Sequence, residues 1–269
     1  MRYRFDSDAP LIRHSSARRG CRFGFTTSTV QSSHIRNLSE LRQCGVEHIE
    51  VRSDYLCPRD VLAEYPHASY IMDEHDPHIA RLIARMGFSR IIVNPNRIAD
   101  PTDWRFLGSA LLVENQDASA RNKSNLENLM TRLPEAGICL NFTSALYDPA
   151  IIAEFILKYG RRIREVRMGS CAPDMGSNYI AMSEQTARVA VGFIRLLPRK
   201  CPVVIDVPLD AEWHSAKKDL SMVVDEYRKR QSSKPAHTNK LMVAVSQMAF
   251  EWKTVTQNMF DGLTSVICD

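Results

Sequence analysis

Short apolar runs rich in β-branched residues alternate along this chain with segments in which apolar residues recur every three or four positions. The first pattern is typical of strands and the second of amphipathic helices, and their regular alternation predicts βα units on a parallel sheet. The apolar runs are nearly continuous, which favours strands covered on both faces. Eight such runs are present: 22–27, 46–52, 68–73, 90–94, 110–115, 137–142, 163–168 and 202–207.

Helical patterns fill most of the connections between these runs. The clearest is 78–86, where Ile79, Leu82, Ile83 and Met86 define one face. The connections after the second and fourth runs are short for a full helix. Glycines at 45, 87, 137 and 160 are expected to end helices in the left-handed conformation, and prolines at 58, 77, 101 and 149 to occupy first turns. The other helical patterns cover 34–43, 126–133, 150–159, 184–197, 211–230 and 241–263.

Eight βα units in 269 residues predict one (β/α)8 TIM barrel, because barrels of this class typically need about 250 residues. We expect residues 1–20, rich in Arg and Ser, to form an N-terminal arm. We expect residues 21–269 to form the barrel together with an extra C-terminal helix over 241–263. No second domain is predicted.

Composition narrows the class of protein. The opening segment lacks the apolar core of a signal peptide, and no run approaches the ~18 apolar residues of a membrane span. Seven cysteines without a CxxC pair indicate reduced thiols, so we expect a soluble cytoplasmic protein. A net charge of +4 is too small to indicate a nucleic-acid partner. A small-molecule substrate is expected, and an oligomer is compatible with the sequence.

In a barrel of this kind the carboxyl ends of the strands form one shared mouth, so the polar residues at those ends are the candidate functional groups. We single out ten such residues. They are Glu50, Arg52, His75, Asn94, Glu114, Asn115, Asn141, Ser144, Arg167 and Asp206.

The motifs at the strand ends resemble those of the xylose isomerase-like barrel family, the sugar phosphate isomerase/epimerase group that includes endonuclease IV. The resemblance covers roughly residues 21–210 and rests on the order and spacing of the motifs. They read RFGFTTST with QCGVEHIEVR, then DEHDP, IIVNPN, LLVENQD, ICLNFTSA, RIREVRMGS and VVIDV.

The resemblance implies a divalent metal held by a Glu, an Asp, a His and a Glu from the fifth to eighth strands. This chain departs from that set, since the matching positions carry Glu114, Asn141, Arg167 and Asp206. Ser144 and Asn94 also stand where the family has His. An Arg has no lone pair to donate and carries a permanent charge. We therefore expect no metal or other cofactor, with a weaker site of Glu50, His75, Glu114 and Asp206 as the open alternative.

Each candidate has a functional and a structural interpretation. Glu114 and Asp206 are expected as an acid–base pair, or else as salt-bridged carboxylates at the mouth. His75 is expected as a general acid or as a residue that starts the next helix. Arg167 is expected to bind an anionic substrate, to pair internally, or both. Glu50 and Arg52 are expected to bind substrate or to form a structural ion pair.

The remaining polar residues, Asn94, Asn115, Asn141 and Ser144, are expected either to bind a polyol or to close turns. Taken together, the features predict an isomerase/epimerase-like enzyme, or a lyase, that moves a proton next to a carbonyl of a small polar or anionic metabolite, with an altered or lost metal site. One alternative is a catalytically silent barrel that binds or scaffolds in a biosynthetic pathway. A weaker one is an endonuclease IV-like nuclease.

Overall fold

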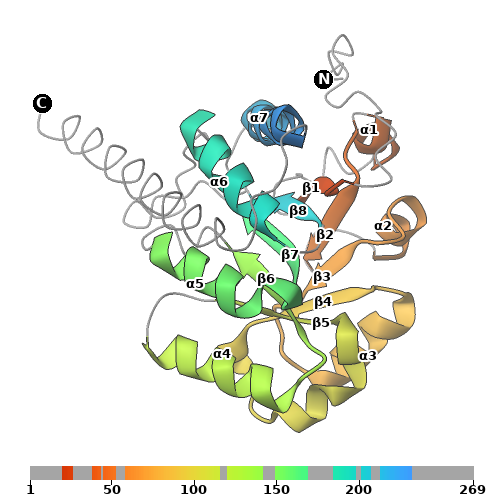
Figure 1. The fold of residues 1–269 in the computed structure, drawn as a ribbon. Coiled ribbons are helices and arrows are strands. Elements are labelled where there is room, and N and C mark those ends of the chain that lie inside the picture. Colours follow the sequence, from red (N-terminus) through yellow and green to blue (C-terminus); the bar gives the residue numbers. More distant parts are fainter. Residues whose placement is uncertain are drawn as a thin grey trace, which may run out of the picture.

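The computed structural model describes residues 20–26, 38–43, 45–52, 58–115, 120–141, 149–168, 184–197, 201–206 and 213–231. Within these residues, eight parallel strands close into a barrel in the order β1 to β8, and β8 pairs with β1. Helices surround the strands on the outside (Figure 1). The predicted (β/α)8 TIM barrel is therefore confirmed.

All eight predicted runs form strands, each within a few residues of its predicted bounds. They are β1 (Phe23–Thr26), β2 (His48–Arg52), β3 (Ser69–Ile71), β4 (Arg90–Val93), β5 (Leu111–Glu114), β6 (Gly137–Asn141), β7 (Ile163–Met168) and β8 (Val203–Ile205). Nearly every residue of these strands is buried, because side chains on one face fill the barrel and those on the other contact the helices.

The α-helices follow the predicted periodicity. They are α1 (Leu38–Gln43), α2 (Pro58–Glu64), α3 (Pro77–Met86), α4 (Ala120–Arg132), α5 (Pro149–Tyr159), α6 (Glu184–Leu196) and α7 (Trp213–Gln231). The connection after β4 holds the 3-10 helices η2 (Pro95–Arg97) and η3 (Pro101–Ala110), and η4 (Gly160–Arg162) precedes β7. Each of the four singled-out prolines stands at the first position of a helix, as predicted.

Two of the four predicted helix-ending glycines have the expected conformation. Gly45 has φ 87° and Gly87 has φ 109°. The prediction is wrong for Gly137, which begins β6, and for Gly160, which lies in η4. The end of α4 is satisfied instead by the Arg162 side chain, which donates four hydrogen bonds of 2.7–2.9 Å to the carbonyls of Met130, Leu133 and Ala136.

The barrel interior contains a small apolar cluster and a network of polar side chains. Ile71, Ile92, Leu112 and Cys139 form the apolar cluster, which is contributed by β3 to β6. Strand alternation places the buried polar side chains of β2 and β7 on the same inner face. Glu114 on β5 and Asn141 on β6 each stand two residues after a member of the apolar cluster, so the polar network extends to these strands as well.

Gly24 on β1 allows β1 and β2 to approach one another closely. A Cβ atom at this position would lie 1.7 Å from the carbonyl oxygen of His48 on β2. Strand β2 also contacts β8, which is not its neighbour in the barrel. A glycine is therefore required at this position.

The predicted arm over 1–20, apart from Gly20, and the predicted helix over 241–263 lie outside the described residues. The proposed extent of the domain and the cytoplasmic location stay predictions. No helix within the described ranges has the length and apolar character needed to cross a membrane.

Candidate functional site

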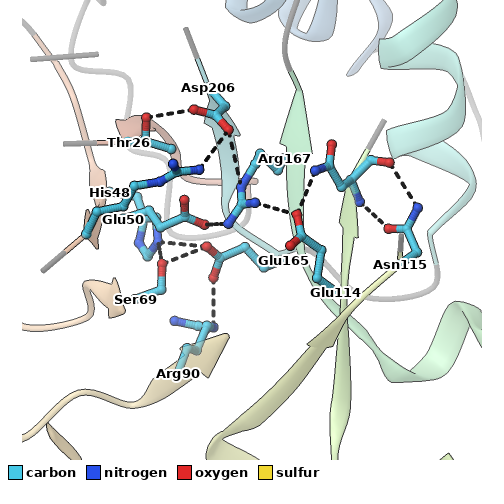
Figure 2. A network of polar contacts seen from close by, with 12 residues as sticks. Thr26, His48, Glu50, Ser69, Arg90, Glu114, Asn115, Glu165, Arg167 and Asp206 are labelled. Carbon is cyan, nitrogen blue, oxygen red and sulfur yellow. Dashed lines mark hydrogen bonds and ion pairs between the residues drawn. The ribbon is translucent and has the colours of Figure 1, made fainter. Parts of the chain in front are cut away.

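The Arg167 guanidinium lies at the centre of a cluster of carboxylates near the carboxyl ends of the strands (Figure 2). It extends inward from β7, and its side chain is 2% exposed. One terminal nitrogen donates to Glu114 Oε1, and the other donates to Glu50 Oε2 at 2.7 Å. Its Nε lies 3.9 Å from Asp206 Oδ2. The convergence of Glu114, Arg167 and Asp206 predicted from the sequence is thus present.

Asp206 and Arg52 form the more accessible part of the cluster. Their side chains are 23% and 31% exposed, and Arg52 Nη2 lies 3.5 Å from Asp206 Oδ2. The hydroxyl of Thr26 donates to Asp206 Oδ1 at 3.1 Å. The cation of Arg52 and the carboxylate of Asp206 are therefore partly accessible to a ligand, while the buried hydroxyl of Thr26 orients the carboxylate from below.

Two amides connect Glu114 to the neighbouring strand. Asn141 Nδ2 donates to Glu114 Oε1 at 2.6 Å, so this oxygen accepts hydrogen bonds from both the Asn141 amide and the Arg167 guanidinium. The Asn115 side chain donates to the backbone carbonyl of Asn141 at 3.0 Å and accepts from its backbone amide. Asn115 therefore joins β5 to β6, and Asn141 orients the carboxylate.

Protonation within the cluster is set by burial and charge together. Burial raises the pKa of Glu50 to about 8, even though Arg167 lowers it. Burial would lower the pKa of Arg167, but Glu114 and Glu50 raise it well above its usual value. Glu50 Oε1 is buried without a hydrogen-bond partner among the described residues. Burial therefore favours the protonated form of Glu50 near neutral pH, while the neighbouring carboxylates keep Arg167 charged.

A second polar layer lies below the cluster (Figure 2). Ser69 donates to Glu165 Oε1 at 2.6 Å, His48 Nε2 lies 3.0 Å from the Ser69 hydroxyl, and Arg90 Nε lies 3.8 Å from Glu165 Oε2. Burial lowers the pKa of His48, which favours the neutral imidazole. Burial would raise the pKa of Glu165, but contacts with His48, Ser69 and Arg90 lower it on balance. This layer therefore retains an ionised carboxylate deep in the barrel.

His75 and Asn94 contact each other rather than the Arg167 cluster. The backbone amide of Asn94 donates to His75 Nε2 at 2.7 Å, so the ring proton is on Nδ1, which donates to the Asp73 carbonyl at 3.2 Å. The Asn94 side chain accepts from the amide of Asn96 and begins η2. Both side chains thus close turns in this structure. A catalytic role for His75 and substrate binding by Asn94 stay predictions that this geometry does not favour.

A divalent metal does not fit the cluster as it is built. The Arg167 guanidinium is bonded to the Glu114 and Glu50 oxygens that would otherwise coordinate a metal. It cannot act as a ligand itself, because it has no lone pair to donate. At an effective dielectric constant of about 20, two unit charges about 4 Å apart repel by about 4 kcal/mol, and a divalent ion doubles this. The alternative site with His75 would need one of its two engaged nitrogens to be released. No group of three or more His, Cys, Asp or Glu suited to a metal occurs in the part of the chain that the structure describes.

The structure brings together six of the ten residues expected at the mouth. They are Glu50, Arg52, Glu114, Asn141, Arg167 and Asp206. Asn115 lies beside them, but its side chain is hydrogen-bonded to the backbone of Asn141. Ser144 lies outside the described residues. Glu50 is fully buried, so direct contact with a substrate, which the sequence suggested, would require Arg167 to move.

Sequence reasoning missed the layer formed by His48, Ser69, Glu165 and Arg90, and also missed Thr26. Strand alternation could have found part of it. On β2, His48, Glu50 and Arg52 are two residues apart, and on β7 the same holds for Glu165 and Arg167. Polar residues at alternate positions of an otherwise apolar barrel strand indicate a polar inner face.

No protein-family model matches the sequence, and neither does any curated protein. Solved structures do match. A xylose isomerase-like TIM barrel/4-hydroxyphenylpyruvate dioxygenase fusion protein is 15% identical with a TM-score of 0.60, and the match covers 81% of this chain. This chain spans 45% of the length of that fusion protein. The match shows that this chain shares the (β/α)8 barrel fold with a xylose isomerase-like barrel.

Other barrels resemble it to a similar degree. The D-psicose 3-epimerase of Clostridium cellulolyticum H10, solved with D-tagatose, is 8% identical with a TM-score of 0.54, covering 77% of this chain and 98% of the epimerase. The 7,8-dihydropteroate synthase of Vibrio fischeri ES114 is 10% identical with a TM-score of 0.54, covering 81% and 95%. Identities this low establish the shared fold only. The resemblance indicated by the strand-end motifs is confirmed at that level.

Proposed function

We propose that this barrel is an isomerase/epimerase-like enzyme that transfers a proton next to a carbonyl group of a small polar or anionic metabolite. The observation that carries the proposal is the Arg167 guanidinium, held between Glu114, Glu50 and Asp206 at the strand ends. A fixed positive charge in a site of low dielectric stabilises the negative charge that develops on a carbonyl oxygen when the neighbouring carbon loses its proton.

Asp206 is the best-placed base of the three carboxylates. Its side chain is 23% exposed, compared with 10% for Glu114 and 0% for Glu50. Its carboxylate would take the proton from the carbon, and the electrons of the broken C–H bond would move to the carbonyl oxygen to give an enolate. Delivery of a proton to the opposite face by a second acid, with the enolate electrons returning to that carbon, epimerises it. If the carbon that lost its proton carries a hydroxyl, transfer of the hydroxyl proton to the enolate oxygen, with delivery of the proton from Asp206 to the former carbonyl carbon, isomerises the compound.

Arg52 would hold an anionic group of the substrate at the same edge of the mouth. Its guanidinium is 31% exposed and lies beside Asp206, so a bound carboxylate or phosphate would bring the reacting carbon near the base. Glu114 is the second acid–base candidate, oriented by Asn141. Since His75 binds backbone groups through both ring nitrogens, this scheme assigns it no proton transfer.

Exchange of carbon-bound hydrogen provides a direct test. Incorporation of deuterium from D2O is measured by NMR for a panel of ketoses, their phosphates and short 2-oxo acids. We expect exchange with at least one member, and a loss of about 10²–10⁴-fold in the Asp206→Asn variant, the range typical of a general base. Asp225→Asn on the exposed face of α7 is the matched control and should retain activity. Absence of exchange across the panel, or an Asp206→Asn variant as active as the wild type, contradicts the proposal.

A catalytically silent barrel is the second candidate, and it is favoured by the burial of Arg167 against the carboxylates it contacts. On this hypothesis the cluster only stabilises the barrel, and a Glu114→Gln variant would retain full biological activity. The nuclease hypothesis would need a metal cluster that these side chains do not supply, so salt-sensitive DNA binding would be required to support it.

A further inference from the structure

A pocket opens at the end of the barrel opposite the Arg167 cluster. It lies between η3, the start of β5 and the turn that joins α4 to β6, and its volume is about 330 Å³. This is at the lower end of the range of about 300–1,000 Å³ for pockets that hold small molecules. Trp104, Leu111 and Leu133 are apolar residues of its lining, and Arg105, Arg132 and Glu135 are its charged ones.

The charged groups of this pocket are available to a ligand. Arg105 and Glu135 are both exposed, and neither forms a hydrogen bond or an ion pair with another described residue. Arg132 pairs with Asp100 at 3.1 Å, which balances its charge. Among the residues that the structure describes, Arg105 and Glu135 are therefore a cation and an anion without a charged partner, next to the largely buried side chains of Trp104, Leu111 and Leu133.

Gly108 shapes the wall between these two charges. Its φ of 50° and ψ of −121° interrupt the helical conformation of η3, and residues with a side chain rarely adopt this region. A Cβ atom here would lie 2.9 Å from Glu135 Oε2, so the absence of a side chain lets the Glu135 carboxylate lie against the kinked backbone.

We propose that this pocket binds a free α-amino acid with an apolar side chain. The Arg105 guanidinium, with Arg132 beside it, would bind the carboxylate, and Glu135 would bind the ammonium group. The apolar residues, Trp104 among them, would contact the side chain. A simple anion would meet the negative charge of Glu135, while an uncharged apolar molecule would leave both charges without a partner. Catalytic sites of TIM barrels lie at the carboxyl ends of the strands, so this would be a separate, non-catalytic site.

Isothermal titration calorimetry with L-phenylalanine as the probe tests the binding, and two analogues test the recognition of each charge. 3-Phenylpropanoate lacks the ammonium group, and 2-phenylethylamine lacks the carboxylate. We expect L-phenylalanine to bind with one-to-one stoichiometry and about tenfold or more tightly than either analogue, because each lost group removes a charge-assisted hydrogen bond. A shift of the Trp104 indole NH signal in an NMR titration, identified with a Trp104→Phe variant, would place the ligand in this pocket.

Substitutions on the rim separate recognition from non-specific binding. Arg105→Gln and Glu135→Gln should each weaken L-phenylalanine binding about tenfold, and Glu135→Gln should abolish the preference over 3-phenylpropanoate. Arg85→Gln, at an exposed position on α3, is the matched control and should bind as the wild type does. The proposal is wrong if L-phenylalanine and L-leucine both fail to bind saturably. It is also wrong if 3-phenylpropanoate binds as tightly, or if both rim variants retain wild-type affinity.

Discussion

Replacing Glu50 with Gln should change how the stability of this barrel depends on pH. Burial raises the pKa of Glu50 to about 8 in the folded protein, whereas the ordinary value is 4.5. Between these two values the unfolded chain has released the proton and the folded protein still holds it. The folded state then binds more protons, so the contribution of Glu50 to the free energy of unfolding falls as pH rises.

The size of this effect follows from the two pKa values. A rise from 4.5 to about 8 corresponds to roughly 5 kcal/mol of stability, fully present below pH 4.5 and lost by the time the pH exceeds about 8. Gln has nearly the same shape, cannot ionise, and can still accept from Arg167. Its NH2 group would replace the unpartnered Oε1, at a cost of about 1–3 kcal/mol. The variant should be slightly less stable than the wild type at pH 5 and more stable at pH 8.5.

Urea unfolding from pH 5 to 9 measures this difference, with coincident circular dichroism and fluorescence transitions as the check on two-state behaviour. Subtracting the two profiles cancels the titration of groups that Glu50 does not influence, and leaves Glu50 together with its charged neighbours Glu165 and Asp206. Glu74→Gln, at an exposed position, is the control and should follow the wild type. If the Glu50→Gln and wild-type profiles run parallel, Glu50 does not retain its proton and the charge assignment of the cluster is wrong.

Further variants and additives test the rest of the architecture. Arg167→Met would leave the Glu114 carboxylate buried without its counter-ion and Glu50 without a hydrogen-bond donor, and should cost about 3–5 kcal/mol in urea unfolding; a loss below about 1 kcal/mol would contradict the central role of this ion cluster. Gly24→Ala should prevent folding or lower Tm strongly, since its Cβ would lie 1.7 Å from a carbonyl oxygen. Gly87→Ala, which meets nothing closer than 3.9 Å, should cost only about 1 kcal/mol for its positive φ, and equal losses would refute the steric argument. Addition of Mn²⁺ should leave the Tm of the wild type unchanged because Arg167 occupies the centre of the cluster, and a rise that saturates with Mn²⁺ would show that a metal site exists.

The sequence was sufficient to predict the barrel because its signals are local and repeated. Continuous apolar runs such as 90–94 favour strands covered on both faces, and the repetition of eight such runs at βα spacing favours a closed parallel barrel. The connection after β4 was less predictable. The 3-10 helix η3 contains a kink at Gly108, and the φ angle of a single glycine cannot be predicted from the sequence.

The candidate site could be predicted as a set of residues but not as a set of contacts. The position of Arg167 at a strand end placed it near Glu114 and Asp206, and the ion pairs agree. The depth of each side chain was not predictable, because it depends on strand register. Thus Glu50 lies below Arg167, while Asp206 reaches the surface. The contacts of His75 with backbone atoms also depend on a turn that residue types do not specify.

The uneven filling of the barrel has a consequence for engineering. Strands β3 to β6 contribute the apolar cluster of Ile71, Ile92, Leu112 and Cys139, which contains no charged side chain. Leu112 and Cys139 stand two residues before Glu114 and Asn141 on the same inner face, so they lie directly beneath side chains of the candidate site. Varying these two positions would alter the support of that site together with thermal tolerance, whereas Ile71 and Ile92 could be varied with less effect on it.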